Sequence, residues 1–273
     1  MRVGVFYHED FSVYGYPVLK DRVAPAFNSL QDLVKAGRVM VFTPSVGERA
    51  LHLLNKVHAP SLIEDVTREG YYEVSLLSAA GVVEAAEKLQ AGELDLAFCF
   101  VGAAGHHASR DHYWGFCFFN DAAMAVVRLR ELGVERIMII DVDPHFGDGT
   151  RSLLGSDPQV IHINFHSGQG DKEDAESNNY DYGIGAADDS LFMDKINEVM
   201  GRQWEYEFLI VIFGHDSHFL DYGAFHLSEL SYSFLARKVK EFAAGKPILF
   251  ILSGGSNPEV GRTAVRAIIQ EFV

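Results

Sequence analysis

The chain has 273 residues, of which 48% are hydrophobic and 22% charged, a balance that is ordinary for a globular protein. No apolar run approaches the roughly 20 residues that a helix needs to cross a bilayer. The formal net charge of -15 opposes general affinity for nucleic acid or anionic membranes, because phosphate binding needs a basic face. We therefore expect no nucleic-acid or membrane partner. The negative charge favours a small neutral or cationic substrate, but solubility alone would also explain it.

Two cysteines, Cys99 and Cys117, are too few for a disulfide framework, and they do not form a Cys-x-x-Cys pair. The first residues enter a strand-like run directly and lack the apolar stretch and cleavage site of a signal peptide. We therefore expect a cytoplasmic protein. The sequence does not indicate an oligomeric state.

Short apolar runs alternate with longer amphipathic segments along the chain. The runs predicted to be buried strands are Val3–Tyr7, Leu94–Phe100, Arg136–Ile140, Val160–Phe165, Phe208–Phe213 and Ile248–Leu252. Helical spacing predicts helices over Val74–Leu89, Asp121–Leu132, Ser190–Met200, Ser228–Ala243 and Pro258–Phe272. This alternation predicts a doubly wound α/β fold with a three-layer parallel sheet, in one domain over residues 1–273. Residues 166–188, rich in Gly, Asp, Asn and Ser, are predicted to be the longest loop.

Unusual polar segments follow four of these strands. They are VGAAGHHAS (101–109), DVDPHFGDGT (141–150), GHDSH (214–218) and SGGSNPE (253–259). In an open α/β sheet, ligands bind beyond the carboxyl ends of the strands, so we expect these four segments to converge.

Two of these segments carry a predicted metal site. Asp143 and His145 are two residues apart, so in an extended segment they face the same side, and Asp216 can approach from another strand. Two carboxylates and an imidazole suit Zn²⁺ or Fe²⁺ and leave a position for water. We predict these three as ligands, and expect Asp141 and Asp148 to orient histidine rings. Taken singly, each of these polar residues has a plainer explanation as part of a turn, a helix cap or a surface side chain. Their joint placement at the ends of strands favours a metal site.

From about residue 70 to residue 261 the chain resembles the histone deacetylase superfamily, which includes acetoin-utilisation and acylpolyamine deacetylases and has an arginase-like α/β fold. The resemblance is carried, in the family's order and spacing, by GHHA (105–108), GFCFFND (115–121), DVDPH (141–145), GDGT (147–150) and GHDSH (214–218). A binuclear manganese hydrolase of the arginase branch is less similar, because its Asp-Ala-His-x-Asp run is absent.

The resemblance implies a zinc-dependent amidohydrolase that removes an acyl group from an acyl-lysine or an acylpolyamine. It places zinc on the same three ligands as the spacing does. It makes His107 the general base and later the acid, paired with Asp148, and pairs His106 with Asp141.

The resemblance also makes Gly115 and Phe116 a wall of the acyl channel, and places a structural potassium ion on the backbone of residues 141–145. Phe116 has a plain alternative as a core aromatic.

Ser256 departs from the family, whose Gly-Gly-Tyr segment is here Gly254-Gly255-Ser256. That tyrosine donates a hydrogen bond to the substrate carbonyl, and losing one such donor typically costs roughly 10²–10³ in rate. Three alternatives remain open: His218 or Tyr222 supplies the donor, the vacated space admits a larger acyl group or a water, or the chain is a zinc-containing binding protein that turns over weakly or not at all. Ser256 also fits a capping box for the following helix, with Asn257 as the alternative N-cap.

Overall fold

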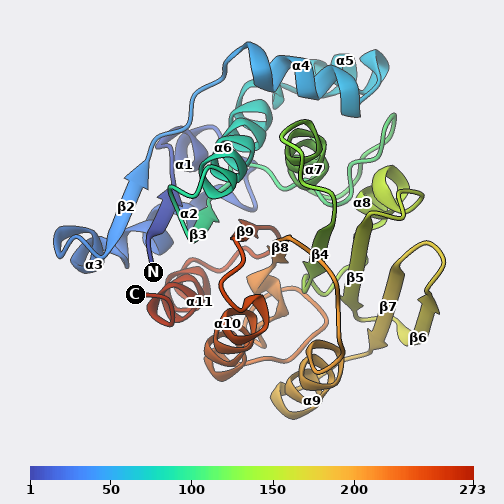
Figure 1. The fold of residues 1–273 in the computed structure, drawn as a ribbon. Helices are drawn as coiled ribbons and strands as arrows, with labels where there is room; N and C mark the ends of the chain where they lie inside the picture. Colours follow the sequence, from blue (N-terminus) through green and yellow to red (C-terminus); the bar gives the residue numbers. More distant parts are fainter.

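The computed structural model describes all residues, 1–273, and has one nine-stranded sheet in the order β2-β1-β3-β9-β8-β4-β5-β7-β6 (Figure 1). Only β6 runs antiparallel to its neighbour. The strands are β1 Val3–Phe6, β2 Val39–Phe42, β3 Leu96–Cys99, β4 Ile137–Asp141, β5 Val160–His166, β6 Gln169–Asp174, β7 Asn179–Ile184, β8 Phe208–Phe213 and β9 Ile248–Leu252. The mostly parallel sheet agrees with the sequence prediction.

Helices cover both faces of the sheet, as Figure 1 shows. On one face α6 and α7 pack together with α4, and on the other α10 packs between α9 and α11, with α2 against α11. The helices are α1 Asp10–Val13, α2 Lys20–Asn28, α3 Gln31–Lys35, α4 Glu48–Val57, α5 Pro60–Glu69, α6 Tyr72–Gln90, α7 Asp121–Glu131, α8 Asp148–Leu154, α9 Asp189–Met200, α10 Glu229–Ala243 and α11 Pro258–Gln270. None of them combines the length and the hydrophobicity that crossing a membrane would require.

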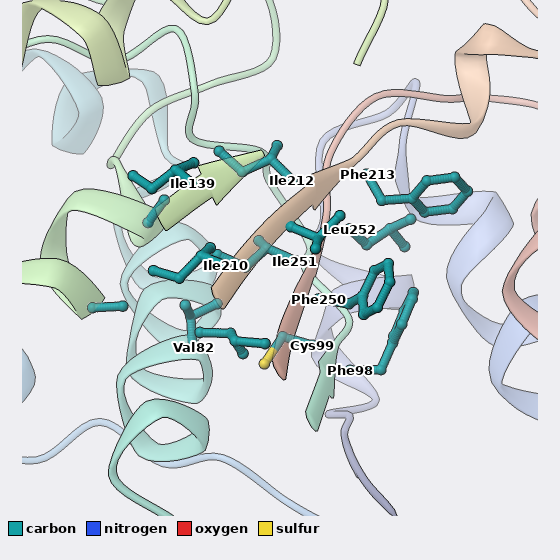
Figure 2. Close-up of a cluster of buried hydrophobic side chains, with 14 of the residues drawn as sticks. Val82, Phe98, Cys99, Ile139, Ile210, Ile212, Phe213, Phe250, Ile251 and Leu252 are labelled. Atoms are coloured by element: carbon teal, nitrogen blue, oxygen red, sulfur yellow. The ribbon is translucent and has the colours of Figure 1, made fainter. Parts of the chain in front are cut away.

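The sheet's central strands are apolar on both faces because helices bury both. Cys99, Ile251 and Ile212 lie side by side in neighbouring strands and share a face, with Val82 of α6 near Cys99 (Figure 2). Alternate residues point the opposite way, so Phe98 and Phe250 stack beneath the other layer with ring centroids 6.1 Å apart. This double burial explains why the central strands are continuous apolar runs.

The prediction of a single long loop over 166–188 was wrong. This segment contains β6 and β7, which form an antiparallel hairpin at the edge of the sheet. Every residue of β6 is exposed and its sequence, QGDKED, carries no apolar residue. An edge strand that buries neither face leaves no hydrophobic pattern, and its composition is therefore that of a loop.

The parallel register brings the polar segments together at one edge of the sheet. Asp141, the last residue of β4, pairs with Ile212 of β8 and with Asn164 of β5. Phe213 of β8 pairs in turn with Leu252 of β9. The chain therefore leaves β4, β8 and β9 at neighbouring points, where the predicted site residues follow.

Candidate metal centre

Asp143, His145 and Asp216 form the one cluster of the chain in which three possible metal-binding side chains meet. One ligand atom from each lies within 4.8 Å of the others. His145 Nδ1 is 2.9 Å from Asp143 Oδ1 and 3.2 Å from Asp216 Oδ2. Both carboxylates are fully buried. The three residues chosen from spacing are thus brought together.

The two buried carboxylates of the cluster have too little positive charge around them, and a bound cation would supply it. Neither carboxylate oxygen of Asp216 has a hydrogen-bond partner. Burial, and then the nearby Asp143, raise the pKa of Asp216 to about 7. The hydrogen bond to Asp143, and then the ion-pair contact with Asp216, raise the pKa of His145 to about 10, so a protonated His145 supplies positive charge to the cluster when no metal is bound. Two carboxylates and one imidazole are a donor set that fits a single Zn²⁺.

Two glycine segments let the backbone approach these carboxylates closely. A Cβ on Gly254 would lie 2.4 Å from Asp216 Oδ2, and one on Gly214 would lie 2.3 Å from Asp216 Oδ1. The Gly254 N–H donates to Asp143 Oδ2 at 2.9 Å. Because any side chain at these positions would fill the space around the carboxylates, the glycines keep the cluster open to a cation.

Two histidine–carboxylate pairs lie beside the cluster, as the resemblance implied. His106 Nδ1 is 3.0 Å from Asp141 Oδ2, and His107 Nδ1 is 2.7 Å from Asp148 Oδ1. In each pair the imidazole Nδ1–H donates to a carboxylate oxygen, which leaves Nε2 to act toward the site.

The two imidazoles differ in charge. Burial alone would lower the pKa of His106, but Asp143 and Asp141 outweigh it and raise that pKa to about 9. Burial, and then the adjacent His106, lower the pKa of His107 to about 3. At neutral pH His106 is therefore a cation and His107 a neutral imidazole, which is the form that can accept a proton.

A cavity of about 210 Å³ opens over the cluster and is lined by His107, His145 and Asp216 together with aromatic side chains. The aromatic residues of its wall are Trp114, Phe116 and Tyr222. Gly115, in the left-handed conformation at φ +65°, also lines it. Gly115 and Phe116 thus lie where the resemblance expected a channel wall. A second hollow of about 450 Å³ shares none of these lining residues.

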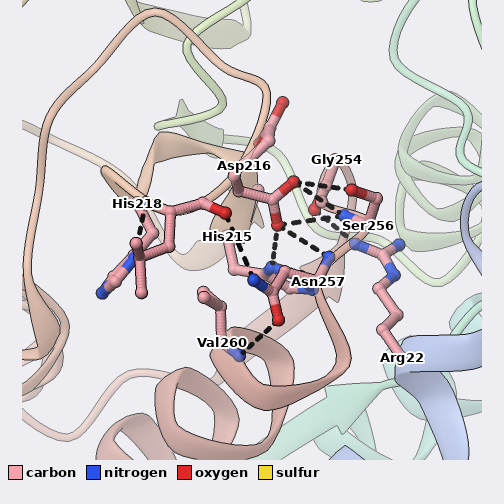
Figure 3. A network of polar contacts seen from close by, with 12 residues as sticks. Arg22, His215, Asp216, His218, Gly254, Ser256, Asn257 and Val260 are labelled. Carbon is pink, nitrogen blue, oxygen red and sulfur yellow. Dashed lines mark hydrogen bonds and ion pairs between the residues drawn. The ribbon is translucent and has the colours of Figure 1, made fainter.

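Ser256 does not line this cavity. Its hydroxyl donates to Asp221 Oδ1 at 2.8 Å, and the Asp221 carboxylate also accepts from the backbone N–H groups of Ser256 and Asn257. His215 Nδ1 is 3.1 Å from Asp221 Oδ2. Figure 3 shows this network around His215, Ser256 and Asn257. Asp221 therefore joins the segment after β8 to the segment after β9.

The cap of α11 is Asn257, and a capping box from Ser256 is not formed. The Asn257 side chain accepts from the backbone N–H of Glu259 and Val260, and Pro258 occupies the first turn. The alternative N-cap was therefore the right one. His218 lies outside the cavity, with its Nε2 3.5 Å from Glu229.

Three functional positions were missed from the sequence. Trp114 covers His107, and Asp221 joins the two strand-end segments. Arg22 of α2 is fully buried and its guanidinium donates to the carbonyl oxygens of Ser253 and Gly254 (Figure 3). Only Trp114 carried a sequence signal, because it directly precedes the GFCFFND motif.

Comparisons with known proteins identify the family of this chain. Residues 54–272 match the histone deacetylase domain. Histone deacetylase 5 of Arabidopsis thaliana is 29% identical over 94% of this chain, which spans only 46% of that relative. The acetylpolyamine amidohydrolase of Mycoplana ramosa is 29% identical over 72% of this chain and 62% of its own length. A probable deacetylase of Archaeoglobus fulgidus is 27% identical over 81% of this chain and 71% of its own length.

The crystal structure of the HDA15 HD domain has the same fold. It superimposes with a TM-score of 0.85 at 21% identity, covering 98% of this chain and 87% of that one. The expected arginase/deacetylase-type α/β architecture is therefore confirmed. With its match to the family model over residues 54–272, the chain belongs to the histone deacetylase domain family.

Proposed function

We propose that this protein is a zinc-dependent amidohydrolase that removes an acyl group from a small acylated amine or an acyl-lysine. The observation that carries the proposal is the buried Asp216 carboxylate, which accepts no hydrogen bond and has only an ion-pair contact with His145, beside Asp143. A divalent cation is the simplest group that would satisfy them. Zinc, when bound there, polarises a carbonyl and lowers the pKa of a water to about 7.

His107 moves the proton in this proposal. Its Nδ1–H is held by Asp148 at 2.7 Å, so Nε2 faces the cavity as a neutral base. It takes a proton from the attacking water and gives a proton to the departing amine nitrogen. His106, held by Asp141 at 3.0 Å, lies beside His107 with ring centroids 4.0 Å apart.

The substrate class follows from the cavity and from the charge of the protein. Trp114, Phe116 and Tyr222 give the cavity aromatic walls, which suit an aliphatic chain that ends in an acyl amide. The net charge of -15 favours a cationic remainder such as a polyamine. The acetylpolyamine amidohydrolase among the relatives supports this choice. Acyl-lysine has the same combination of aliphatic chain and amide.

The test is acetate release from acetylpolyamines and from acetyl-lysine peptides by the zinc-loaded chain, with metal content measured alongside. We expect about one zinc per chain, since three ligands serve one ion. Two manganese ions per chain would instead indicate a ureohydrolase. Tight binding of the acylated amine without acetate release would favour the second candidate, a zinc-containing binding protein, which the serine at position 256 brings into consideration.

Other features of the proposal have separate tests. Iron(II) in place of zinc is distinguished by the metal found after purification without added metal. The structural potassium ion predicts that activity depends on KCl. Cytoplasmic location and a single catalytic domain over residues 1–273 also stay predictions.

A further inference from the structure

Tyr222 occupies a distinctive place in the wall of the cavity. It follows Asp221 in the segment after β8, and its ring meets Phe116 edge to face with centroids 5.8 Å apart. The His145 ring lies 6.1 Å from the Tyr222 ring and 6.2 Å from the His107 ring. Tyr222 and His107, the proposed general base, therefore border the same small space around His145.

The Tyr222 hydroxyl is held by the backbone and keeps its own proton free. It accepts a hydrogen bond from the Gly255 N–H at 2.9 Å, and no protein group accepts from it. Gly255 is buried, with φ at +118°, and a Cβ there would lie 2.3 Å from the His215 ring. Only glycine fits this geometry, which turns the Gly255 N–H toward the phenol.

The backbone of Tyr222 is fixed as well. Its N–H donates to Asp221 Oδ1 at 2.9 Å, and the same carboxylate binds the backbone of Ser256. The adjacent peptide N–H, that of Gly254, donates to Asp143. One short stretch of backbone thus sets both the phenol hydroxyl and a carboxylate of the metal cluster. Tyr222 as a whole residue is 43% exposed, while its hydroxyl end meets the buried Gly255.

The charge around the hydroxyl keeps it a donor. Burial, and then the carboxylates of Asp216 and Asp143, raise the pKa of Tyr222 well above its usual range. The phenol therefore stays protonated, and its O–H is available to a group that gains negative charge in the cavity.

Amide hydrolysis produces such a group. As water adds to the carbonyl carbon, an electron pair of the C=O bond moves onto oxygen, and a fixed donor stabilises that charge. The other hydroxyl in the cavity wall, on Ser253, is also without a partner, but Ser253 is only 2% exposed. Ser253 is therefore the alternative donor, and the test below distinguishes it from Tyr222.

We propose that the Tyr222 hydroxyl is the hydrogen-bond donor to the substrate carbonyl oxygen and to the oxyanion of the tetrahedral intermediate. The inference rests on the proposed amidohydrolase function. Collapse of that intermediate breaks the C–N bond, and the nitrogen leaves with a proton from His107. Tyr222 keeps its proton throughout, so its contribution is electrostatic.

The test compares Tyr222→Phe, which removes only the hydroxyl, with Tyr113→Phe. The Tyr113 hydroxyl donates to Glu69 at 2.7 Å and does not line the cavity. For Tyr222→Phe we expect kcat to fall roughly 10²–10³-fold with a small change in KM. Zinc content and thermal midpoint should match those of the unchanged protein. Tyr113→Phe should keep the unchanged rate.

A binding measurement keeps the inference testable even if the proposed function fails. The probe is a trifluoromethyl ketone analogue of acetyl-lysine, whose hydrate resembles the tetrahedral intermediate. Tyr222→Phe should weaken its binding by at least about tenfold, while binding of the free amine product stays unchanged. Equal ketone affinity and equal kcat in Tyr222→Phe would overturn the inference, as would a selective loss in Ser253→Ala. No turnover by the unchanged protein, with weaker ketone binding by Tyr222→Phe, would overturn the proposed function alone.

Discussion

The indole of Trp114 stacks on the imidazole of His107, with ring centroids 3.7 Å apart and an angle of 29° between the ring planes. The same indole donates through Nε1–H to Asp148 Oδ2 at 2.8 Å, while the other Asp148 oxygen binds His107. Trp114 therefore contacts both members of the pair, and it excludes water from one face of the base.

Replacing Trp114 is expected to change the pH dependence of the reaction. Burial is the main cause of the low pKa of His107, so Trp114→Leu, which uncovers the ring, should raise that pKa. Losing the indole N–H donor also concentrates negative charge on Asp148, and this too raises the pKa of His107. When the pKa of the base is raised, the base becomes protonated, and therefore inactive, at a less acidic pH. The acidic limb of the kcat/KM profile should therefore shift to higher pH. The measurement is the pH profile of acetate release.

Trp114→Phe separates the two effects, because it keeps a ring over His107 and removes only the hydrogen bond to Asp148. We expect its acidic limb to lie between those of the unchanged protein and Trp114→Leu. Superimposable profiles for all three proteins would show that Trp114 has no influence on the base.

The fold was predictable where buried strands require a recognisable pattern of apolar residues in the sequence. The six predicted strands correspond to β1, β3, β4, β5, β8 and β9, with ends that differ by at most two residues. In contrast β2, with the sequence VMVF, is an edge strand with one buried residue, and β6 is entirely polar. Edge strands bury little surface, so their sequences are weakly constrained by packing.

The candidate site was predictable where strand order alone determines proximity. Asp143, His145 and Asp216 follow β4 and β8, which are neighbours, and their convergence needs no knowledge of loop geometry. The path of the loops decides the rest. The contact of Ser256 with Asp221 and the direction of Tyr222 depend on backbone turns such as that at Gly255.

Ser256→Ala is expected to lower stability and leave the rate nearly unchanged. The serine hydroxyl donates to the Asp221 carboxylate at 2.8 Å and lies outside the cavity. A hydrogen bond to a charged group contributes about 1.5–3 kcal/mol, and the backbone donors to Asp221 remain. Urea unfolding of both proteins measures the loss, with acetate release measured in parallel.

Ser256→Tyr provides the opposite check. If Tyr222 already supplies the donor, a tyrosine at position 256 should not raise the rate, and it should disturb the contacts of Asp221. A rise of two orders of magnitude or more would mean that the natural site lacks a donor.

Asp216→Asn is expected to stabilise the metal-free protein while abolishing its response to zinc. The folded-state pKa of Asp216 is about 7, against an ordinary value of 3.8, so folding disfavours the charged form. A raised carboxylate pKa makes the metal-free protein lose stability as pH rises from about 4 to about 7. The neutral amide removes this loss, so the variant should have the higher thermal midpoint at pH 7.5 without metal. Zinc should raise the midpoint of the unchanged protein only.

A lower midpoint for Asp216→Asn in the absence of metal would contradict this expectation. It would show that the contact between Asp216 and His145 stabilises the empty site more than the buried charge destabilises it.

His58 is expected to make the protein less stable in mild acid. Its ring is fully buried, with Nδ1 2.8 Å from the Ser109 carbonyl oxygen and Nε2 accepting from the Asn120 N–H at 2.9 Å. Only the neutral ring satisfies both contacts, and burial lowers its pKa to about 4. Because the unfolded chain binds this proton more readily, stability is complete above about pH 6.5 and falls as pH drops toward 4.

The loss due to one such group is at most about 1.4 kcal/mol per pH unit. His58→Gln should be less stable than the unchanged protein at pH 7.5, yet lose less between pH 7.5 and pH 5. The control is His52→Gln, which removes a histidine whose side chain is 59% exposed on α4. Urea unfolding at the two pH values measures all three. Equal losses in His58→Gln and the unchanged protein would assign the acid sensitivity to the other buried histidines, His162 and His215, whose pKa values burial also lowers.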